Sequence, residues 1–282
     1  KFDAVYIYRD AFFFGTFFES AIKKKGIPIL YDFDDAIWLM DRNPKQGIFN
    51  LLKKPEKTAE IIALSDLVIT GNTYLAEYAK KFNTDVRIIP STIDFEVYKV
   101  LSKKASDKIC IGWTGSFSTL KHFETVVPAL VAIKNQFRDH VSFKVIGDAT
   151  YANEQLGIQG IPWNAETEVE DLMELDIGIM PLPDNPWTRG KCAMKGLQYM
   201  ALGIPTVMSP VGINIDLIKD GENGFLAGSS EEWIRKLSLL LKDPDLRKKV
   251  GAAGKNTVKG DFSRDANKDK WLNAFRSLEK EH

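Results

Sequence analysis

Short runs of β-branched and aromatic residues alternate with longer amphipathic stretches along almost the whole chain. This alternation is typical of parallel strands joined by crossover helices, and it predicts an α/β fold. In the first part of the chain, the runs expected to form strands are residues 4–8, 28–33, 66–70 and 85–90. The stretches expected to form helices are residues 16–26, 55–65 and 72–82.

The pattern restarts at residue 108 and predicts one doubly wound domain. Its expected strands are residues 108–113, 142–148, 157–161, 176–182 and 205–210. Its expected helices are residues 120–137, 166–175, 191–202 and 229–242, followed by a last amphipathic helix at residues 263–281.

A polar, lysine-rich stretch at residues 91–108 has no sustained periodicity and indicates a connection between domains. We predict a partial N-terminal Rossmann-like domain over residues 1–99, a second Rossmann-like domain over residues 100–260, and a closing helix within 261–282. The first part has only four expected strands and begins almost directly in one of them. We therefore expect that residues preceding Lys1, with a first strand and its ligand loop, are absent from this sequence.

The equal numbers of basic and acidic residues limit the kinds of partner that the chain could bind through its overall charge. The chain has 38 basic and 38 acidic residues, so nothing in its net charge favours nucleic acid or an anionic bilayer as a partner of its whole surface, and any site for an anion must be local. Its two cysteines both fall inside expected secondary structure, which fits a reducing compartment and predicts a cytoplasmic protein. The N-terminus resembles neither a signal peptide nor a membrane span. The aromatic and lysine-rich segment 12–25 fits either peripheral contact at the inner face of a membrane or a buried helix face followed by a solvated turn.

The loop at residues 111–122 follows an expected strand and is rich in Gly, Ser and Thr. In an open parallel sheet, ligands bind beyond the carboxyl ends of the strands, where helix N-termini offer backbone amides. Gly115 would let the backbone approach a phosphate, Ser116 could donate a hydrogen bond, and Lys121 adds charge. The alternative is an ordinary β-to-α turn with an N-cap.

A second loop precedes the helix expected at residues 191–202. Lys191, Lys195 and Gln198 have helical spacing and would share one face of that helix. Two lysines in the first turns of a helix oppose its macrodipole unless an anion lies nearby. Together with Arg189 and Gly190, they indicate a diphosphate site. The alternative is a solvated basic face.

Several motifs in order resemble the group 1 (family 4) retaining glycosyltransferases, which have the two-domain GT-B fold. They are the strand DIGIMPL, the run LQYMALGIPTVMSPVG, the turn DGENGFL, the strand VIGD, and the connector RIIPSTIDFEVY, whose usual form is IPNGVDxxxF. The resemblance covers residues 85–282 well and the preceding part loosely. It implies two Rossmann-like domains with parallel sheets facing a cleft, and a UDP- or GDP-sugar donor held by the C-terminal domain without a metal or other cofactor.

The sequence departs from the motifs of this family at several positions. The family often has an E-x(7)-E pair, in which the first glutamate contacts the donor sugar and the second holds the ribose. Gly190 and Gln198 stand at those places here. An amide can still bind a ribose, whereas glycine offers only its backbone. We expect Lys191 and Lys195 to supply the cationic charge, and Lys121 to replace the family's first-loop lysine.

Four further residues lie at or just beyond the ends of expected strands. Asp34 and Asp35 lie where the resemblance places a residue that contacts the donor sugar, and they could also orient acceptor hydroxyls, bind a cation or cap a helix. Asp148 borders the nucleotide site or caps the next segment. Trp163 is expected either to form a platform for the base or to pack in the core or between the domains.

The resulting prediction is a glycosyltransferase that moves a sugar, with retention and without a metal, from a nucleoside-diphosphate sugar to a glycan, a lipid-linked or a small-molecule acceptor. Its setting would be polysaccharide biosynthesis. Its predicted catalytic residues are Asp34, Asp35, Lys191 and Lys195. Its predicted donor-binding residues are Gly115, Ser116, Lys121, Asp148, Trp163, Arg189, Gly190 and Gln198. The alternatives are a non-catalytic nucleotide-sugar-binding fragment and a GT-B sugar-nucleotide epimerase.

Overall fold

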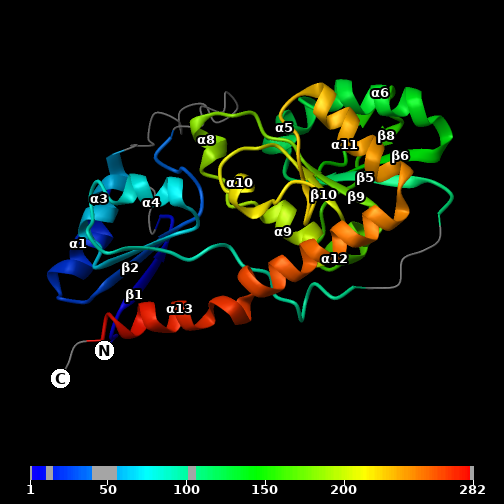
Figure 1. Cartoon of the computed structure of the whole chain (residues 1–282). Coiled ribbons are helices and arrows are strands. Elements are labelled where there is room, and N and C mark those ends of the chain that lie inside the picture. Colours follow the sequence, from blue (N-terminus) through cyan, green and yellow to red (C-terminus); the bar gives the residue numbers. More distant parts are fainter. Residues whose placement is uncertain (1, 11–14, 40–55, 101–105, 280–282) are drawn as a thin grey trace. The chain divides into compact units, whose positions relative to one another are not determined.

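The chain forms two compact units, each built on a parallel sheet (Figure 1). The computed structural model describes residues 2–10, 15–39, 56–100 and 106–279. Unit 1 consists of Lys1–Ser91, Asp184–Cys192 and Asn267–His282, and unit 2 of Thr92–Pro183 and Ala193–Ala266. The predicted division at residues 99 and 260 stays a prediction. The contacts within the structure join two later stretches of sequence to the first unit.

The sheet of unit 1 has four parallel strands in the order β1-β2-β3-β4. They are β1 (Val5–Tyr8), β2 (Ile29–Phe33), β3 (Leu67–Thr70) and β4 (Val86–Ile88). The helices between them are α1 (Phe17–Lys24), α3 (Glu56–Leu64) and α4 (Thr73–Ala79). Each element falls within a range predicted from the sequence.

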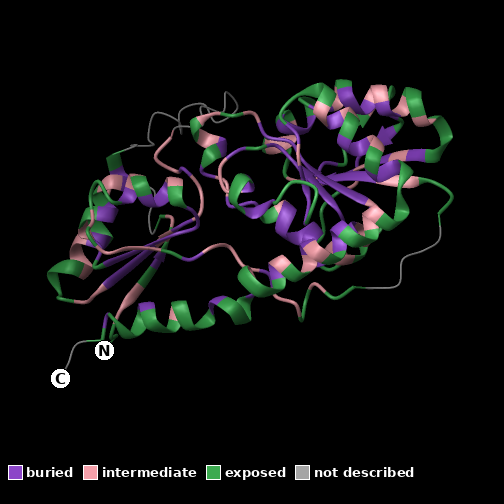
Figure 2. Cartoon of the chain, in the orientation of Figure 1, coloured by how far each residue is buried: buried purple, intermediate pink, exposed green. Residues whose placement is uncertain are grey.

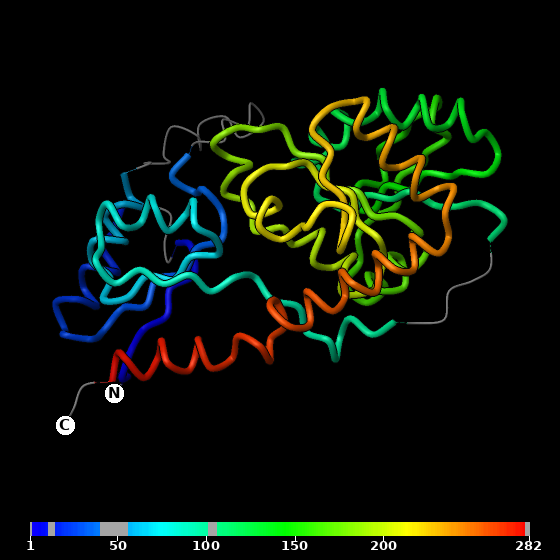
Figure 3. Tube along the Cα trace, viewed as in Figure 1, coloured from blue at the N-terminus to red at the C-terminus, as the bar shows by residue number. Residues whose placement is uncertain are grey.

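Successive residues of these strands serve opposite faces of the sheet, because side chains alternate along a strand. Tyr31 and Phe33 pack with Ile61 and Leu75 of the covering helices. The opposite face, formed by Leu30, Leu67, Ile69 and Ile89, packs with Ala274 and Leu278 from the C-terminal part of the chain. Figure 3 shows helix α13 (Arg264–Arg276), in red, running beside the blue first strand.

The sheet of unit 2 has five parallel strands in the order β11-β10-β9-β5-β6. They are β5 (Ile109–Thr114), β6 (Val141–Ile146), β9 (Ile177–Met180), β10 (Thr206–Met208) and β11 (Phe225–Leu226). The chain proceeds from β5 to β6 on one side and returns to β9 on the other side of β5. Such a reversal of strand order is a topological switch point, beside which open α/β sheets bind ligands.

The strands of unit 2 are buried almost throughout, as the purple arrows in Figure 2 show. The helices of this unit are α5 (Leu120–Glu124), α6 (Val127–Phe137), α7 (Glu168–Met173), α9 (Met194–Ala201), α10 (Asn214–Leu217), α11 (Ser230–Lys242) and α12 (Pro244–Asp261). Between β6 and α7, the strands β7 (Ala152–Asn153) and β8 (Ile158–Gln159) form a short hairpin. None of the helices within the described ranges has the length and apolarity needed to cross a bilayer.

Some predictions of strands need correction. The strand expected at residues 157–161 lies outside the five-stranded sheet, because β8 pairs antiparallel with β7. The turn expected at DGENGFL ends in strand β11.

Two helix predictions are wrong, and one helix was missed. The single helix expected at residues 120–137 is two helices, α5 and α6, and proline at the start of α6 cannot donate the backbone hydrogen bond that would join them. The helix expected from residue 191 begins only at Met194, after the short helix α8 (Pro186–Arg189). Helix α12 was not predicted. Its glycines obscure the helical pattern, although Gly251 lets it approach the carbonyl of Gly203, where a Cβ would lie 2.0 Å from that oxygen.

Candidate functional site

Unit 2 contains a pocket of about 530 Å³ beside the carboxyl end of β5, at the switch point of its sheet. Its walls come from the loop after β5, the end of β6, the segment before α7, and the first turns of α9. The lining residues are Thr114, Gly115, Ser116, Phe117, Gly147, Pro162, Trp163, Glu168, Met194, Lys195 and Gln198. Five predicted site residues are therefore brought together here, namely Gly115, Ser116, Trp163, Lys195 and Gln198.

Two glycines shape the floor of this pocket, because the loops after β5 and β6 approach each other closely. The Gly115 amide donates to the carbonyl of Ile146 at 2.9 Å. Gly147 has a φ of 129°, and a Cβ on it would lie 1.7 Å from the carbonyl oxygen of Gly115. A side chain is excluded at this position by backbone conformation and by space together.

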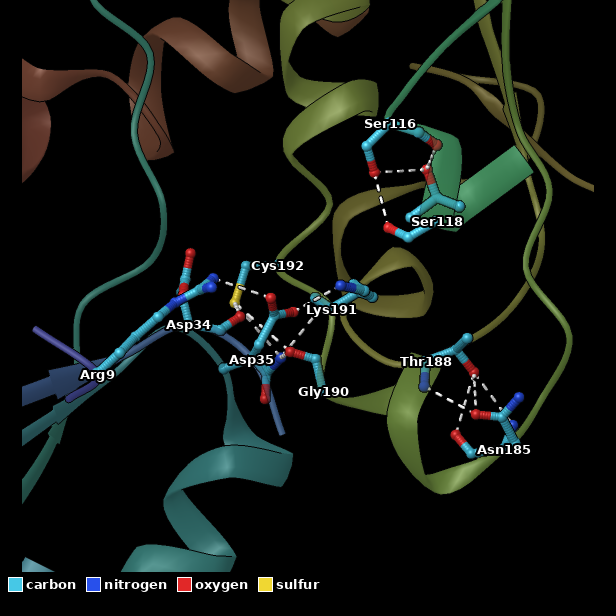
Figure 4. A network of polar contacts seen from close by, with 12 residues as sticks. Arg9, Asp34, Asp35, Ser116, Ser118, Asn185, Thr188, Gly190, Lys191 and Cys192 are labelled. Carbon is cyan, nitrogen blue, oxygen red and sulfur yellow. Dashed lines mark hydrogen bonds and ion pairs between the residues drawn. The ribbon is translucent and has the colours of Figure 1, made fainter. Parts of the chain in front are cut away.

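The loop after β5 carries hydroxyl groups that bond to one another. The Ser116 and Ser118 hydroxyls lie 2.9 Å apart (Figure 4). The Thr119 hydroxyl donates to the Ser116 carbonyl at 2.9 Å. The Ser116 side chain makes no capping bond to the helical turn that follows it. Ser116 thus occupies the N-cap position without a side-chain capping bond, and it lines the pocket.

The start of α9 gives the pocket a positive end. Its N-cap residue, Ala193, has a left-handed φ of 57° and no side chain that could bond to the amides of the first turn. Lys195 follows in that turn and lines the pocket, and its Nζ lies 5.7 Å from the centroid of the Trp113 ring. Uncapped amides and a lysine at a helix N-terminus create a local potential that favours an anion.

A carboxylate with three hydrogen-bond donors around it forms another part of the pocket. Glu168 Oε1 accepts from Trp163 Nε1 at 2.7 Å and from Gln198 Nε2 at 3.1 Å. Its other oxygen, Oε2, accepts from the Tyr98 hydroxyl at 2.6 Å. Gln198 Nε2 also donates to the Tyr98 oxygen at 2.6 Å. Burial, and then the bond to Glu168, raise the pKa of Tyr98, so its hydroxyl keeps the proton that it donates.

Sequence reasoning missed Glu168 and Tyr98. Glu168 was assigned only to an expected helix, and Tyr98 only to the connector. They are 70 residues apart, and nothing in their spacing indicates that they meet. The one available signal was that Tyr98 stands where the resembled connector has phenylalanine, so that a hydroxyl is added near the domain that binds the donor.

Unit 1 holds a second polar cluster at the carboxyl ends of β1 and β2, defined by Arg9, Asp34, Asp35 and Lys191 (Figure 4). Arg9 Nη2 lies 2.6 Å from Asp34 Oδ1 and 2.9 Å from Asp35 Oδ2. Lys191 Nζ lies 2.8 Å from Asp35 Oδ1. Both predicted carboxylates are thus compensated by cations of the chain itself.

The cluster is held in place by the backbone of the segment before α9. Asn72 caps α4 with its side-chain oxygen and uses its Nδ2 to donate to the carbonyls of Gly190 at 3.2 Å and Lys191 at 3.1 Å. A Cβ on Gly190 would lie 2.8 Å from that of Ala36. Gly190 therefore serves close packing within unit 1.

Asp32, at the end of β2, is a further carboxylate near this cluster. Its Oδ2 accepts from the Tyr6 hydroxyl at 2.6 Å. Burial raises the pKa of Asp32 to about 6, and the charge of Asp34 acts in the same direction, while the bond from Tyr6 opposes both.

The remaining predicted residues do not line the pocket of unit 2. Arg189 is exposed in α8 and forms an ion pair with Asp184 at 2.6 Å. Asp148 caps the turn after β6, since its Oδ1 accepts from the amide and the hydroxyl of Thr150 at 2.9 and 2.6 Å. Lys121 lies exposed on α5. For Asp148, the capping alternative is the one that the structure shows.

The expectation that Lys191 and Lys195 share a helix face is wrong. Lys191 precedes α9 and belongs to unit 1, whereas Lys195 lies in α9 and belongs to unit 2. The left-handed turn at Ala193 interrupts the helix between them. Among the residues that the structure describes, no group of three or more His, Cys, Asp or Glu side chains is arranged to hold a metal ion.

The part of the chain that contains the pocket matches a known family. Residues 108–243 match the family described as Glycosyl transferases group 1. The chain is 28% identical over 205 residues to a putative teichuronic acid biosynthesis glycosyltransferase of Bacillus subtilis, a match that covers 64% of this chain and 49% of that protein. The chain spans a fifth to a half of the length of the curated relatives it matches.

Solved structures show the same fold at low identity. Sucrose-phosphate synthase from Thermosynechococcus elongatus superposes with a TM-score of 0.73 at 15% identity, covering 98% of this chain and 74% of that one. Anabaena HepE, in complex with UDP and glucose, gives a TM-score of 0.68 at 16% identity and covers 92% of this chain and 74% of that one. These likenesses establish the predicted α/β fold with parallel sheets as that of the GT-B glycosyltransferases.

Proposed function

Residues 108–243 match the glycosyl transferases group 1 family, and on that premise we propose that the chain transfers a sugar from a nucleoside-diphosphate sugar to an acceptor. The observation that carries the proposal is the pocket of unit 2. One part of it offers Lys195 and the uncapped start of α9, and another offers Trp163 and the Glu168 carboxylate. A diphosphate fits the cationic part, and a nucleoside fits the aromatic and carboxylate part.

The structure of HepE supports this assignment of the donor, because that protein has the same fold and was solved with UDP and glucose. UDP- and GDP-sugars are both candidate donors for the present chain. The choice between them depends on contacts of the base with the walls of the pocket.

The chemical role of the pocket follows from charge. When the bond between the anomeric carbon and the diphosphate breaks, negative charge develops on the leaving phosphate, and an oxocarbenium-like sugar forms. A lysine and helix amides that are already aimed at the phosphate stabilise that charge without rearranging. This mechanism requires no metal. Retention of configuration is the outcome that the resemblance to the family implies.

Unit 1 is proposed to bind the acceptor through the cluster of Arg9, Asp34, Asp35 and Lys191. Because Asp34 and Asp35 already accept from Arg9 and Lys191, their charges are balanced. Their oxygens can still orient acceptor hydroxyls, since a carboxylate has about four lone-pair sites. Asp32, with its raised pKa of about 6, would be partly protonated at weakly acidic pH and could exchange a proton with a hydroxyl group.

The acceptor is proposed to be a glycan, either free or linked to a lipid.

Phe17 and Phe18, the aromatic residues that begin α1, are 76% and 48% exposed, so the predicted buried face is wrong for them. Residues 12–14 of the same predicted contact segment lie outside the described residues. Phe17, Phe18 and the lysines that end α1 would allow contact with an anionic bilayer. This contact is tested by sedimentation with anionic vesicles, compared for the wild type and Phe17→Ser. If the contact exists, less of the variant than of the wild type sediments with the vesicles.

Calorimetric titration of the full chain with UDP, GDP and their sugar conjugates tests the donor proposal. Lys195→Ala is expected to weaken binding by about tenfold or more, because it removes a charge-assisted contact to phosphate. Lys248→Ala, an exposed lysine of α12, is the matched control and should leave affinity unchanged. Absence of binding by the folded chain to every nucleotide would overturn the proposal.

Product analysis with bound donor then separates the reactions. Transfer to an added glycan acceptor, with the anomeric configuration read by NMR, is the expected result. Binding without turnover would instead indicate a nucleotide-sugar-binding protein. Conversion of the donor to its epimer without any acceptor would indicate a sugar-nucleotide epimerase.

A further inference from the structure

We propose that Glu168 is the residue that recognises the ribose of the donor, and that Gln198 and Tyr98 are positioning residues that hold its carboxylate. The inference rests on the proposed function, because it places a nucleotide in the pocket of unit 2. It assigns a role to a carboxylate on α7, away from the helix start that carries Lys195.

The hydrogen bonds around Glu168 leave room for a ligand. Its Oε1 accepts two bonds, from Trp163 and Gln198, and its Oε2 accepts one, from Tyr98. A carboxylate has about four lone-pair sites, so Oε2 retains capacity for one more donor. A ribose hydroxyl is such a donor, and a carboxylate that accepts from it is a recurrent way of binding nucleotides in Rossmann-like domains.

The position of Glu168 within the pocket fits a nucleoside. Trp163 and Glu168 both line the pocket, and the indole of Trp163 is tied to the carboxylate by a bond of 2.7 Å. This bond fixes the orientation of a ring that is 53% exposed. A fixed aromatic face beside a hydroxyl acceptor matches the two parts of a nucleoside, with the base against the ring and the ribose at the carboxylate.

The identity of residue 198 follows from the same geometry. Gln198 Nε2 lies 3.1 Å from Glu168 Oε1, and it donates to it. A glutamate at residue 198 would place a second negative charge against Glu168, and two adjacent carboxylates cannot both ionise easily. Because Glu168 supplies the carboxylate, an amide is the residue that fits at 198. The pair therefore needs one acid and one amide.

Tyr98 strengthens this arrangement from the other side. Its hydroxyl donates to Glu168 Oε2 and accepts from Gln198, so the three side chains form a closed ring of hydrogen bonds. Hydrogen bonds to an ionised group are roughly twice as strong as those between neutral groups. The ring thus fixes the carboxylate before the ligand arrives, which reduces the entropy lost on binding.

The test compares the binding of UDP and 2′-deoxy-UDP, or GDP and 2′-deoxy-GDP if the chain prefers guanine, by calorimetry. The wild type is expected to bind the ribonucleotide about tenfold more tightly than its deoxy analogue. In Glu168→Gln the affinity for the ribonucleotide should fall by about tenfold or more, and the preference over the deoxy analogue should disappear. Glu170→Gln, an exposed acid on the same helix, is the matched control and should change neither quantity.

Two further variants keep the test decisive if Glu168→Gln disturbs the pocket. Gln198→Glu should weaken binding, and the double variant Glu168→Gln with Gln198→Glu should recover at least part of the loss, because it restores one acid and one amide. Tyr98→Phe should reduce affinity by about threefold to tenfold while retaining some preference for ribose.

The outcomes separate this inference from the proposed function. If the wild type binds the nucleotide but Glu168→Gln and Tyr98→Phe keep its full affinity and ribose preference, Glu168 does not recognise ribose, although the donor proposal stands. A further decrease in the double variant would also overturn the inference. If the wild type binds no nucleotide at all, the proposed function fails first.

Discussion

Lys191 donates to Asp35 across a separation of 156 residues in the chain, with 2.8 Å between Nζ and Oδ1. The two side chains are largely shielded from water, with relative exposures of 21% and 17%. Asp35 also pairs with Arg9, so one carboxylate holds the end of β1, the end of β2 and the segment before α9 together within unit 1.

The Lys191–Asp35 pair is expected to contribute measurably to stability. Partly buried ion pairs contribute more to the free energy of unfolding than exposed ones. A double-mutant cycle with Lys191→Ala and Asp35→Asn should therefore give a coupling energy of about 1 kcal/mol. The measurement is urea unfolding of the wild type, both single variants and the double variant. Effects that simply add would show that the two side chains are independent in solution. Lys23→Ala, which breaks an exposed pair with Asp66, is a suitable comparison and should cost less.

Asp32 should make stability depend on pH in a defined direction. Its pKa is raised from 3.8 to about 6, so the native state binds the proton more tightly than the unfolded state does. The stability contributed by this group is therefore present below pH 4 and is lost as the pH rises to about 6. The loss has an upper limit of about 3 kcal/mol, because each pKa unit corresponds to 1.36 kcal/mol, and solvent screening reduces it.

The variant Asp32→Asn removes this titration and retains an acceptor for the Tyr6 hydroxyl. It should match the wild type in unfolding midpoint near pH 4 and exceed it at pH 7 to 8. Urea unfolding at five pH values between 4 and 8 measures the difference. A constant difference over that range would contradict the raised pKa.

Gly147 is expected to be irreplaceable in the pocket. Alanine there would combine an unfavourable φ of 129° with a Cβ 1.7 Å from the Gly115 carbonyl, and we expect a loss of at least about 2 kcal/mol in the free energy of unfolding. Nucleotide affinity should fall with it, since the loop after β5 must move. Gly260→Ala in α12 is the control, because a Cβ there meets nothing within 4 Å and should leave stability unchanged or slightly higher.

The two cysteines should differ in reactivity. Cys192 is buried, its Sγ lies 3.1 Å from the Asp34 carbonyl, and burial raises the pKa of its thiol to about 12. Cys110 is partly exposed. Because the thiolate is the reactive form, N-ethylmaleimide at neutral pH should modify Cys110 first and Cys192 only after unfolding. Mass spectrometry of the peptides reads out the order, and rapid modification of Cys192 in the folded chain would contradict the packing of this segment.

Much of the fold was predictable from local pattern. The strands at residues 4–8 and 66–70 were recognised because β-branched and aromatic runs flanked by turn residues are a local signal. The residues at which helices begin and end were harder to predict. The helix expected from residue 191 is interrupted at Ala193 because the backbone there is left-handed. The sequence of the segment does not predict this conformation, since alanine is a strong helix former.

The candidate site divides in the same way. Gly115, Ser116 and Trp163 were expected at the site because they follow strands, and Lys195 and Gln198 because of their helical spacing and the resemblance to the family. All five line the pocket of unit 2. Their roles in binding the donor stay predictions. Arg189, Gly190 and Lys191 were expected beside them, but the contacts of their segment with Asn72 and Asp35 place them in unit 1.

The sequence by itself determined the class of fold, most of the strands and the family to which residues 108–243 are similar, because these depend on periodicity and on motifs within short segments. Only the tertiary structure decided that Glu168 meets Tyr98 and Gln198, and that Lys191 pairs with Asp35. Contacts between residues far apart in the chain depend on how helices pack and where loops turn, and these are set by the whole fold.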